Sequence, residues 1–170
     1  MTPQISENPS SIGGDRRVVP ILALDVPGAA DALALVDRLP RAEWVKVGLQ
    51  LYTAEGPEIV RALRARGRRV FLDLKLHDIP NTVAGAVTSA SHLQVDLLTV
   101  HASGGEAMLR AAAEAAQGAG GLRLLAVTVL TSFTADGLAT TWGRDPLEVE
   151  SEVVRLARLS RAAGVPGVVA

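Results

Sequence analysis

The sequence contains no cysteine and few aromatic residues, and these absences exclude several classes of protein. Without cysteine, the 170-residue chain can form neither disulfides nor thiol nucleophiles nor Cys-ligated metal sites. Aromatic residues make up 3% of the chain, too few for a platform on which nucleic-acid bases stack. Seventeen Lys and Arg residues against 18 Asp and Glu residues give a net charge of −1. We therefore expect neither a nucleic-acid partner nor a membrane partner.

Long hydrophobic runs are also missing. The longest, Leu124 to Leu130, is interrupted by Thr128 and is far too short to cross a bilayer. Residues 1–17 are polar, rich in Ser, Pro and Gly, and lack the apolar centre of a signal peptide. The sequence therefore predicts a flexible tail over 1–17, one domain over 18–170 and a cytoplasmic location.

What the chain does contain is a regular alternation of apolar runs and helical segments. The runs are almost continuously apolar, as expected of parallel strands buried on both faces. The first five begin about 25 residues apart, close to one strand-plus-helix unit of a (β/α) barrel. The predicted strands are Val18–Leu24, Trp44–Leu49, Val70–Leu74, Val95–Val100, Leu122–Leu130 and Val165–Ala170.

The segments between the runs carry the signals of helix ends. Pro57 suits a first helical position, Gly67 and Gly118 suit helix ends, and residues 145–148 resemble a helix cap. Predicted helices cover Ala29–Leu39, Pro57 to about Gly67, Thr82–Ser91, Glu106–Gln117 and a segment from the 145–148 cap to Gly164.

Strict alternation predicts an α/β fold with parallel strands and right-handed crossovers. An open doubly wound sheet would also alternate, but no glycine-rich GxGxxG turn follows the first predicted strand. We therefore favour a (β/α)8 barrel of the TIM type. Because such a barrel takes about 250 residues, the chain has room for about six of its eight strands and ends within the sixth.

Charged residues collect at the carboxyl ends of these predicted strands, where barrel active sites lie. A period of two places Asp73 and Lys75 on one face of the third strand, and Lys46 on the second strand adds another cation. Taken singly, Asp25 could form a turn or a helix cap, Lys46 could extend its head into water, and His101 could be a hydrogen-bonded core residue. Taken together, charges of alternating sign at one barrel mouth indicate a functional site.

The motifs around these charges identify a resemblance. The segment Asp73-x-Lys75-x-x-Asp78, preceded by Ala23-Leu24-Asp25 and Val45-Lys46-Val47-Gly48, resembles the orotidine 5′-phosphate decarboxylase family. The similarity continues through 100–105 (VHASGG) and 126–132 (AVTVLTS), and covers about 18–170. The resemblance implies a C-terminally truncated member, because the family's seventh and eighth βα loops, which supply a phosphate-binding arginine, have no counterpart here.

The resemblance also implies an activity and a set of roles. Orotidine 5′-monophosphate (OMP) would lose CO2 to give UMP, the last step of de novo UMP synthesis, without a cofactor or metal. Its implied catalytic residues are Lys75 as proton donor, Asp73 beside the substrate carboxylate, Lys46, and Asp78 supplied by the other subunit of a homodimer with shared sites. Its implied substrate-binding residues are Asp25, Lys46, Asp73, Asp78, Ile79, Thr82, His101, Thr131 and Ser132. The stretch Phe133–Gly143 would be a lid.

Two alternatives remain open. The DxKxxD element also occurs in metal-dependent sugar-phosphate lyases of the same superfamily, such as 3-keto-L-gulonate-6-phosphate decarboxylase and hexulose-phosphate synthase. Those relatives hold magnesium partly through an acid on the second strand, where this chain has Lys46, and a lysine there would repel the cation. The second alternative is an inactive fragment that lacks the phosphate-binding loops.

Overall fold

The computed structural model describes residues 18–118, 120–144 and 148–170. Within them, parallel strands form one six-stranded sheet in the order β1-β2-β3-β4-β5-β6. The strands are β1 (Ile21–Ala23), β2 (Trp44–Gly48), β3 (Arg69–Leu76), β4 (Leu97–His101), β5 (Arg123–Val127) and β6 (Gly167–Val169). The helices are α1 (Ala29–Arg38), α2 (Leu49–Glu55), α3 (Pro57–Ala65), α4 (Pro80–Ser91), the 3-10 helix η1 (Ala102–Gly104), α5 (Gly105–Gln117), α6 (Ala135–Trp142) and α7 (Val149–Ala162).

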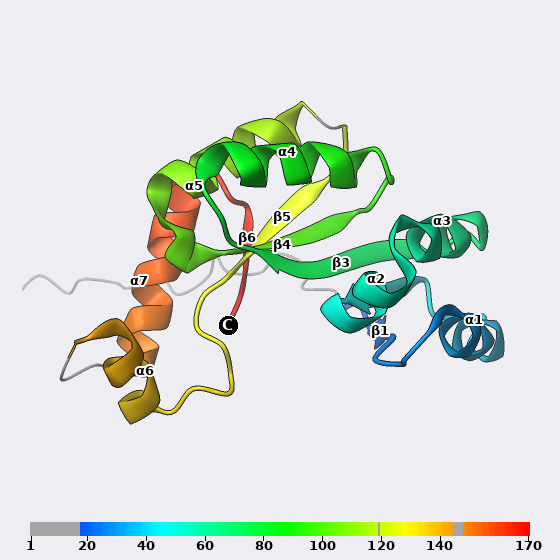
Figure 1. The fold of residues 1–170 in the computed structure, drawn as a ribbon, viewed down its shortest axis with the longest axis horizontal. Helices are drawn as coiled ribbons and strands as arrows, with labels where there is room; N and C mark the ends of the chain where they lie inside the picture. The colour runs from blue at the N-terminus through cyan, green and yellow to red at the C-terminus, as the bar shows by residue number, and fades with distance from the viewer. Residues whose placement is uncertain (1–17, 119, 145–147) are drawn as a thin grey trace, which may run out of the picture.

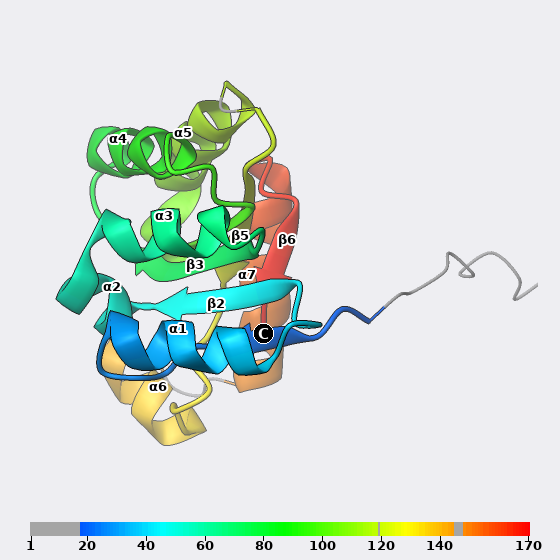
Figure 2. The same ribbon diagram turned by 90° about the vertical axis from the view of Figure 1, so that its right-hand side faces the viewer.

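The sequential strand order confirms the barrel type of fold. In a doubly wound sheet the strand order reverses at a switch point, whereas here every strand pairs with the next one along the chain. The sheet is curved, and the helices are arranged around its outer side (Figures 1 and 2). The described residues thus form six strands of a partial (β/α) barrel.

The core lies between the outer face of the sheet and the helices. Alternate residues of each strand point to this face; in β2, for example, Val45 and Val47 are fully buried. They pack in one apolar cluster with Ile59 and Leu63 of α3 and with aliphatic residues of α4, α5 and α7. The residues between them, such as Lys46, point to the inner face of the sheet. The inner face therefore carries charged side chains such as Lys46 beside apolar ones such as Trp44 and Phe71.

Several predicted boundaries need correction. Strand β3 runs two residues beyond the predicted Leu74 and so includes Lys75. Strand β1 is shorter than Val18–Leu24, since Pro20 has no N–H for the sheet ladder, and β5 ends at Val127 rather than at Leu130. Helices α2 and α6 were not predicted; α2 includes Leu49, which the sequence had placed in a strand, and α6 lies within the segment interpreted as a lid.

Two sequence predictions lie wholly or mostly outside the described residues. They are the flexible tail over 1–17 and the helix cap at 145–148, of which only Glu148 is described, as the residue preceding α7. None of the helices in the described ranges is both long and apolar enough to span a membrane.

Candidate active site

The centre of the site is the carboxylate of Asp73. The ammonium groups of Lys75 in β3 and Lys46 in β2 both lie close to it. The Lys75 Nζ lies 2.8 Å from Asp73 Oδ2, and the Lys46 Nζ lies 3.9 Å from the same oxygen. Lys46 Nζ also donates a hydrogen bond of 3.0 Å to Asp25 Oδ1. The four side chains therefore form a chain of alternating charge, Lys75, Asp73, Lys46 and Asp25, as the sequence predicted for Asp73 and its two lysines.

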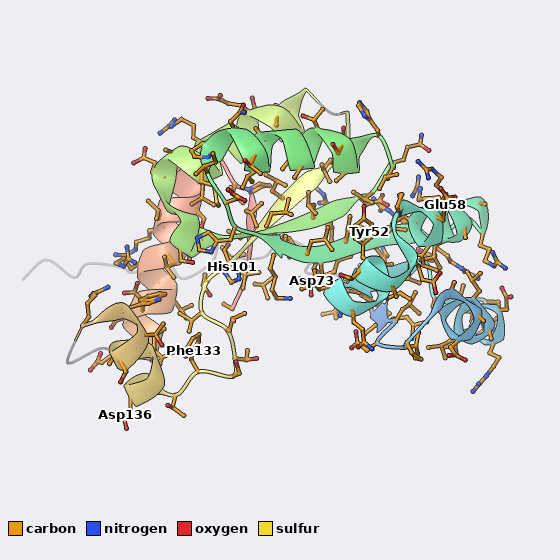
Figure 3. All side chains as sticks on the ribbon, in the orientation of Figure 1. Tyr52, Glu58, Asp73, His101, Phe133 and Asp136 are labelled. Atoms are coloured by element: carbon orange, nitrogen blue, oxygen red, sulfur yellow. The ribbon has the colours of Figure 1, made fainter. Side chains whose placement is uncertain are left out.

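Three adjacent strands bring these side chains together. Lys46 lies in β2, opposite Ala23 of β1 in the ladder, and Asp25 follows two residues after Ala23 on the same face. Asp73 in β3 lies opposite Gly48, two residues beyond Lys46. Asp73 and Lys75 thus lie in the carboxyl-terminal half of β3, Lys46 lies at the middle of β2, and Asp25 follows β1. In Figure 3, Asp73 lies near the middle of the sheet on the side away from α4.

The strand β3 is irregular where it carries the site. Its pairing with β4 shifts between Leu72, which faces Leu98, and Leu76, which faces Val100. Within this irregularity Lys75 has a φ of 51°, in the left-handed region that residues with a Cβ rarely adopt. Backbone strain of this kind clusters at functional sites.

Burial differs along the chain of charges. The Asp73 side chain is 14% exposed and Lys46 is 24% exposed, whereas Lys75 is 37% and Asp25 is 70% exposed. Asp73 is therefore shielded from water and is compensated by two cations and by a hydrogen bond of 2.9 Å from Thr99 Oγ1. The partly exposed Lys75 ammonium can both meet a bound anion and regain a proton from solvent.

His101 lies at the end of β4, next to this cluster, and was expected to bind substrate. Its ring centroid is 5.4 Å from that of His77, and its buried Nδ1 finds no hydrogen-bond partner within the described parts of the chain. Burial lowers the pKa of His101, and the nearby His77 and Lys75 lower it further, while Asp73 opposes them. The imidazole is therefore favoured in its neutral form, and Nδ1 is not satisfied as a core histidine's would be.

In the described part of the chain, the other predicted site residues do not join this network of charges. Among the described residues, Asp78 forms no ion pair; its Oδ1 accepts a hydrogen bond of 2.6 Å from the backbone N–H of Ile79. Ile79 is 66% exposed, Thr82 is exposed in the first turn of α4, and Thr131 and Ser132 are exposed after β5. Their roles in binding substrate stay predictions.

Sequence reasoning missed Thr99, which contacts two members of the cluster. It is fully buried in β4, where a lone threonine suggests packing. Its only sequence signal is its position two residues before His101, which places both on one strand face.

Across the described ranges, no three His, Asp or Glu side chains gather closely enough to hold a metal ion. Metal independence stays a prediction, since it concerns the reaction.

Comparison with known proteins gives consistent findings. The model of the Orotidine 5'-phosphate decarboxylase / HUMPS family matches residues 19–170. The orotidine 5'-phosphate decarboxylase of Moorella thermoacetica is 53% identical over 157 residues, which cover 88% of this chain and 62% of the relative. That of Alkalilimnicola ehrlichii is 54% identical over 151 residues, 88% of this chain and 63% of the relative.

Solved structures agree. The crystal structure of orotidine 5'-phosphate decarboxylase from Lactobacillus acidophilus superposes with a TM-score of 0.81 at 34% identity, covering 88% of this chain and 70% of that one. The crystal structure of a conserved protein from Geobacillus kaustophilus superposes with a TM-score of 0.80 at 39% identity, covering 88% of this chain and 72% of that one. The chain thus spans less than two thirds of the length of the curated relatives quoted above.

Proposed function

This chain belongs to the Orotidine 5'-phosphate decarboxylase / HUMPS family, and on that premise we propose that it converts OMP to UMP and CO2. The observation that carries the proposal is the pair of ammonium groups on one shielded carboxylate oxygen. Lys75 Nζ lies 2.8 Å and Lys46 Nζ lies 3.9 Å from Asp73 Oδ2. Such a cluster suits a reaction that develops negative charge on a substrate that is itself an anion.

The proposed chemistry needs little more than this charge geometry. The bond between C6 of the pyrimidine ring and the carboxylate breaks, CO2 leaves, and the electron pair remains on C6. The Lys75 ammonium stabilises that carbanion by its charge and then transfers a proton to C6, which completes UMP. Asp73 holds Lys75 in place before the reaction, so that the cation needs no reorganisation when charge develops.

The same site argues for the nucleotide decarboxylase over the metal-dependent sugar-phosphate lyases. A divalent cation held by Asp73 and an acid on the second strand would occupy the place where Lys46 puts its ammonium, 3.9 Å from Asp73 Oδ2. The positive charge of Lys46 opposes a second cation at that distance. We therefore propose a reaction that needs no metal and no organic cofactor.

The remaining predicted residues are assigned to substrate binding within the same proposal. The exposed Asp25 carboxylate suits the ribose hydroxyls, and Thr131 and Ser132 lie after β5, where they would approach the base. Asp78 and Thr82 lie just beyond β3, exposed at the rim of the sheet. We propose that they complete the site of a second copy in a homodimer. The cytoplasmic location stays a prediction.

An assay with three substrates tests the proposal. The purified protein is mixed with OMP, with 3-keto-L-gulonate 6-phosphate or with hexulose 6-phosphate, each in excess EDTA and in excess magnesium. We expect turnover of OMP alone, at the same rate in EDTA and in magnesium. Turnover of a sugar phosphate that requires magnesium would place the protein among the metal-dependent lyases. Absence of turnover in all six mixtures would favour the inactive fragment.

A further inference from the structure

Thr99 joins the two catalytic residues of β3 through a single buried hydroxyl. The Thr99 Oγ1 donates a hydrogen bond of 2.9 Å to Asp73 Oδ1 and accepts one of 2.8 Å from the backbone N–H of Lys75. The directions are fixed by chemistry, because a carboxylate can only accept and an N–H can only donate. Thr99 is fully buried, so water cannot replace either bond.

The irregular pairing of β3 with β4 explains why the Lys75 backbone N–H bonds to this hydroxyl. Between the pairs Leu72–Leu98 and Leu76–Val100, three residues of β3 lie opposite Thr99 alone. The sheet ladder therefore cannot supply a regular backbone partner for each of them. The Lys75 N–H goes to the Thr99 side chain instead, at the residue whose φ of 51° is disfavoured for any side chain larger than glycine.

The second bond orients the acid. With Oδ1 bound to Thr99, Asp73 presents Oδ2 to the ammonium groups of Lys75 and Lys46, at 2.8 Å and 3.9 Å. We infer that Thr99 is a positioning residue, whose hydroxyl fixes both the Asp73 carboxylate and the Lys75 backbone in the arrangement used for decarboxylation. Its catalytic consequence rests on the proposed function.

A second buried threonine offers a matched control. Thr128 is 2% exposed, and its hydroxyl donates a hydrogen bond of 3.0 Å to the backbone carbonyl of Val169. It resembles Thr99 in burial and in having a bonded hydroxyl, but among the residues that the structure describes this hydroxyl bonds no charged side chain. A purely structural role for Thr99 would give Thr99→Val and Thr128→Val the same consequences.

The experiment compares Thr99→Val, Thr99→Ser and Thr128→Val with the unaltered protein. Valine keeps the shape and removes the hydroxyl, while serine keeps the hydroxyl. The first readout is hydrogen exchange of the Lys75 backbone amide, followed by NMR. The second readout combines two measurements: kcat with OMP as substrate, and the affinity for UMP. UMP is the product and lacks the carboxylate that leaves.

We expect Thr99→Val to speed exchange of the Lys75 amide by roughly ten- to a hundredfold, because a buried hydrogen bond is lost. We also expect kcat to fall by roughly tenfold to a hundredfold with UMP affinity nearly unchanged, since misplaced groups cost rate more than binding. Thr99→Ser keeps the hydroxyl, so its Lys75 exchange rate and its kcat should both lie close to those of the unaltered protein. Thr128→Val should leave the exchange of the Lys75 amide unchanged.

The two readouts separate the inference from the proposed function. If Thr99→Val leaves Lys75 exchange unchanged, or changes it no more than Thr128→Val does, the positioning inference is wrong whatever the protein catalyses. If exchange quickens in Thr99→Val but kcat and UMP affinity fall by the same factor, Thr99 supports binding and the inference is likewise wrong. If the unaltered protein does not act on OMP, the proposed function fails, and the exchange data alone decide whether Thr99 holds Lys75.

Discussion

Replacing Lys75 should abolish turnover while leaving the fold nearly intact. Lys75 is 37% exposed, and an ion pair that reaches solvent to this extent contributes less than about 1 kcal/mol to stability. Asp73 is not left unpaired in Lys75→Ala, because Lys46 remains 3.9 Å away and Thr99 still donates its hydrogen bond. The variant thereby avoids the roughly 3–5 kcal/mol cost of an uncompensated buried charge. For a chain of this size we expect a fall in Tm below about 4 °C.

The effect on catalysis should be far larger. Lys75 is proposed to stabilise the carbanion and to protonate it, and losing both contributions should lower kcat by about 10⁴-fold or more. Lys75→Arg is the informative companion, because a guanidinium keeps the positive charge but does not release its proton. It should keep the stability of the unaltered protein and still lose at least about 100-fold in kcat.

Thermal unfolding, UMP titration and a kcat measurement on the two variants check this reasoning. UMP affinity should change little, since UMP lacks the departing carboxylate. A Lys75→Ala protein that is well folded and retains more than about a hundredth of the rate would refute the assignment of the proton donor. Lys46 would then be the first residue to test, because its ammonium is the other cation on Asp73.

Two further predictions concern assembly and pH. If the sites are shared as proposed, mixing inactive Asp78→Asn subunits with inactive Lys75→Ala subunits under exchanging conditions should restore activity, because a mixed dimer would have one complete site; no recovery would contradict shared sites. Glu152→Gln should lower the free energy of unfolding at pH 7 by about 1.5–3 kcal/mol, since charge-assisted hydrogen bonds to a buried carboxylate weaken. The hydrogen bond from Arg155 is the main cause that lowers the pKa of Glu152 below its ordinary 4.5. The difference in free energy of unfolding between the unaltered protein and Glu152→Gln should therefore have its full size above pH 4.5 and should vanish as the pH falls through the lowered pKa. Urea unfolding between pH 3 and pH 7 measures this, and a difference that persists undiminished at the acid end would contradict it.

The strands could be predicted because parallel strands are buried on both faces and therefore appear as continuous apolar runs. Short helices carry no such pattern. Helix α2 buries only Leu51 and α6 buries only Leu138, so neither has the apolar stripe by which an amphipathic helix is found. The apolar run that marks the third strand ends at Leu74, whereas the ladder of β3 continues through the charged Lys75 to Leu76, so a polar residue within a strand hides its true end.

The candidate site was predictable where it depends on strand period and strand order. Asp73, Lys75 and Lys46 followed from alternation along two adjacent strands. Thr99 did not, because its contacts depend on the irregular pairing of β3 with β4, which places three residues opposite one. A register shift of this kind is a property of two strands together, and it leaves no periodic signal in either.

The most direct test of the central claim is a proton NMR spectrum of the product formed from OMP in D2O containing excess EDTA. If a carbanion forms at C6 and takes its proton from the Lys75 ammonium, whose hydrogens exchange with solvent, the UMP formed should carry deuterium at C6. We therefore predict UMP with no H6 signal and with H5 as a singlet, at a rate that added magnesium does not change. Absence of UMP, or UMP that appears only after magnesium is added, would contradict the account.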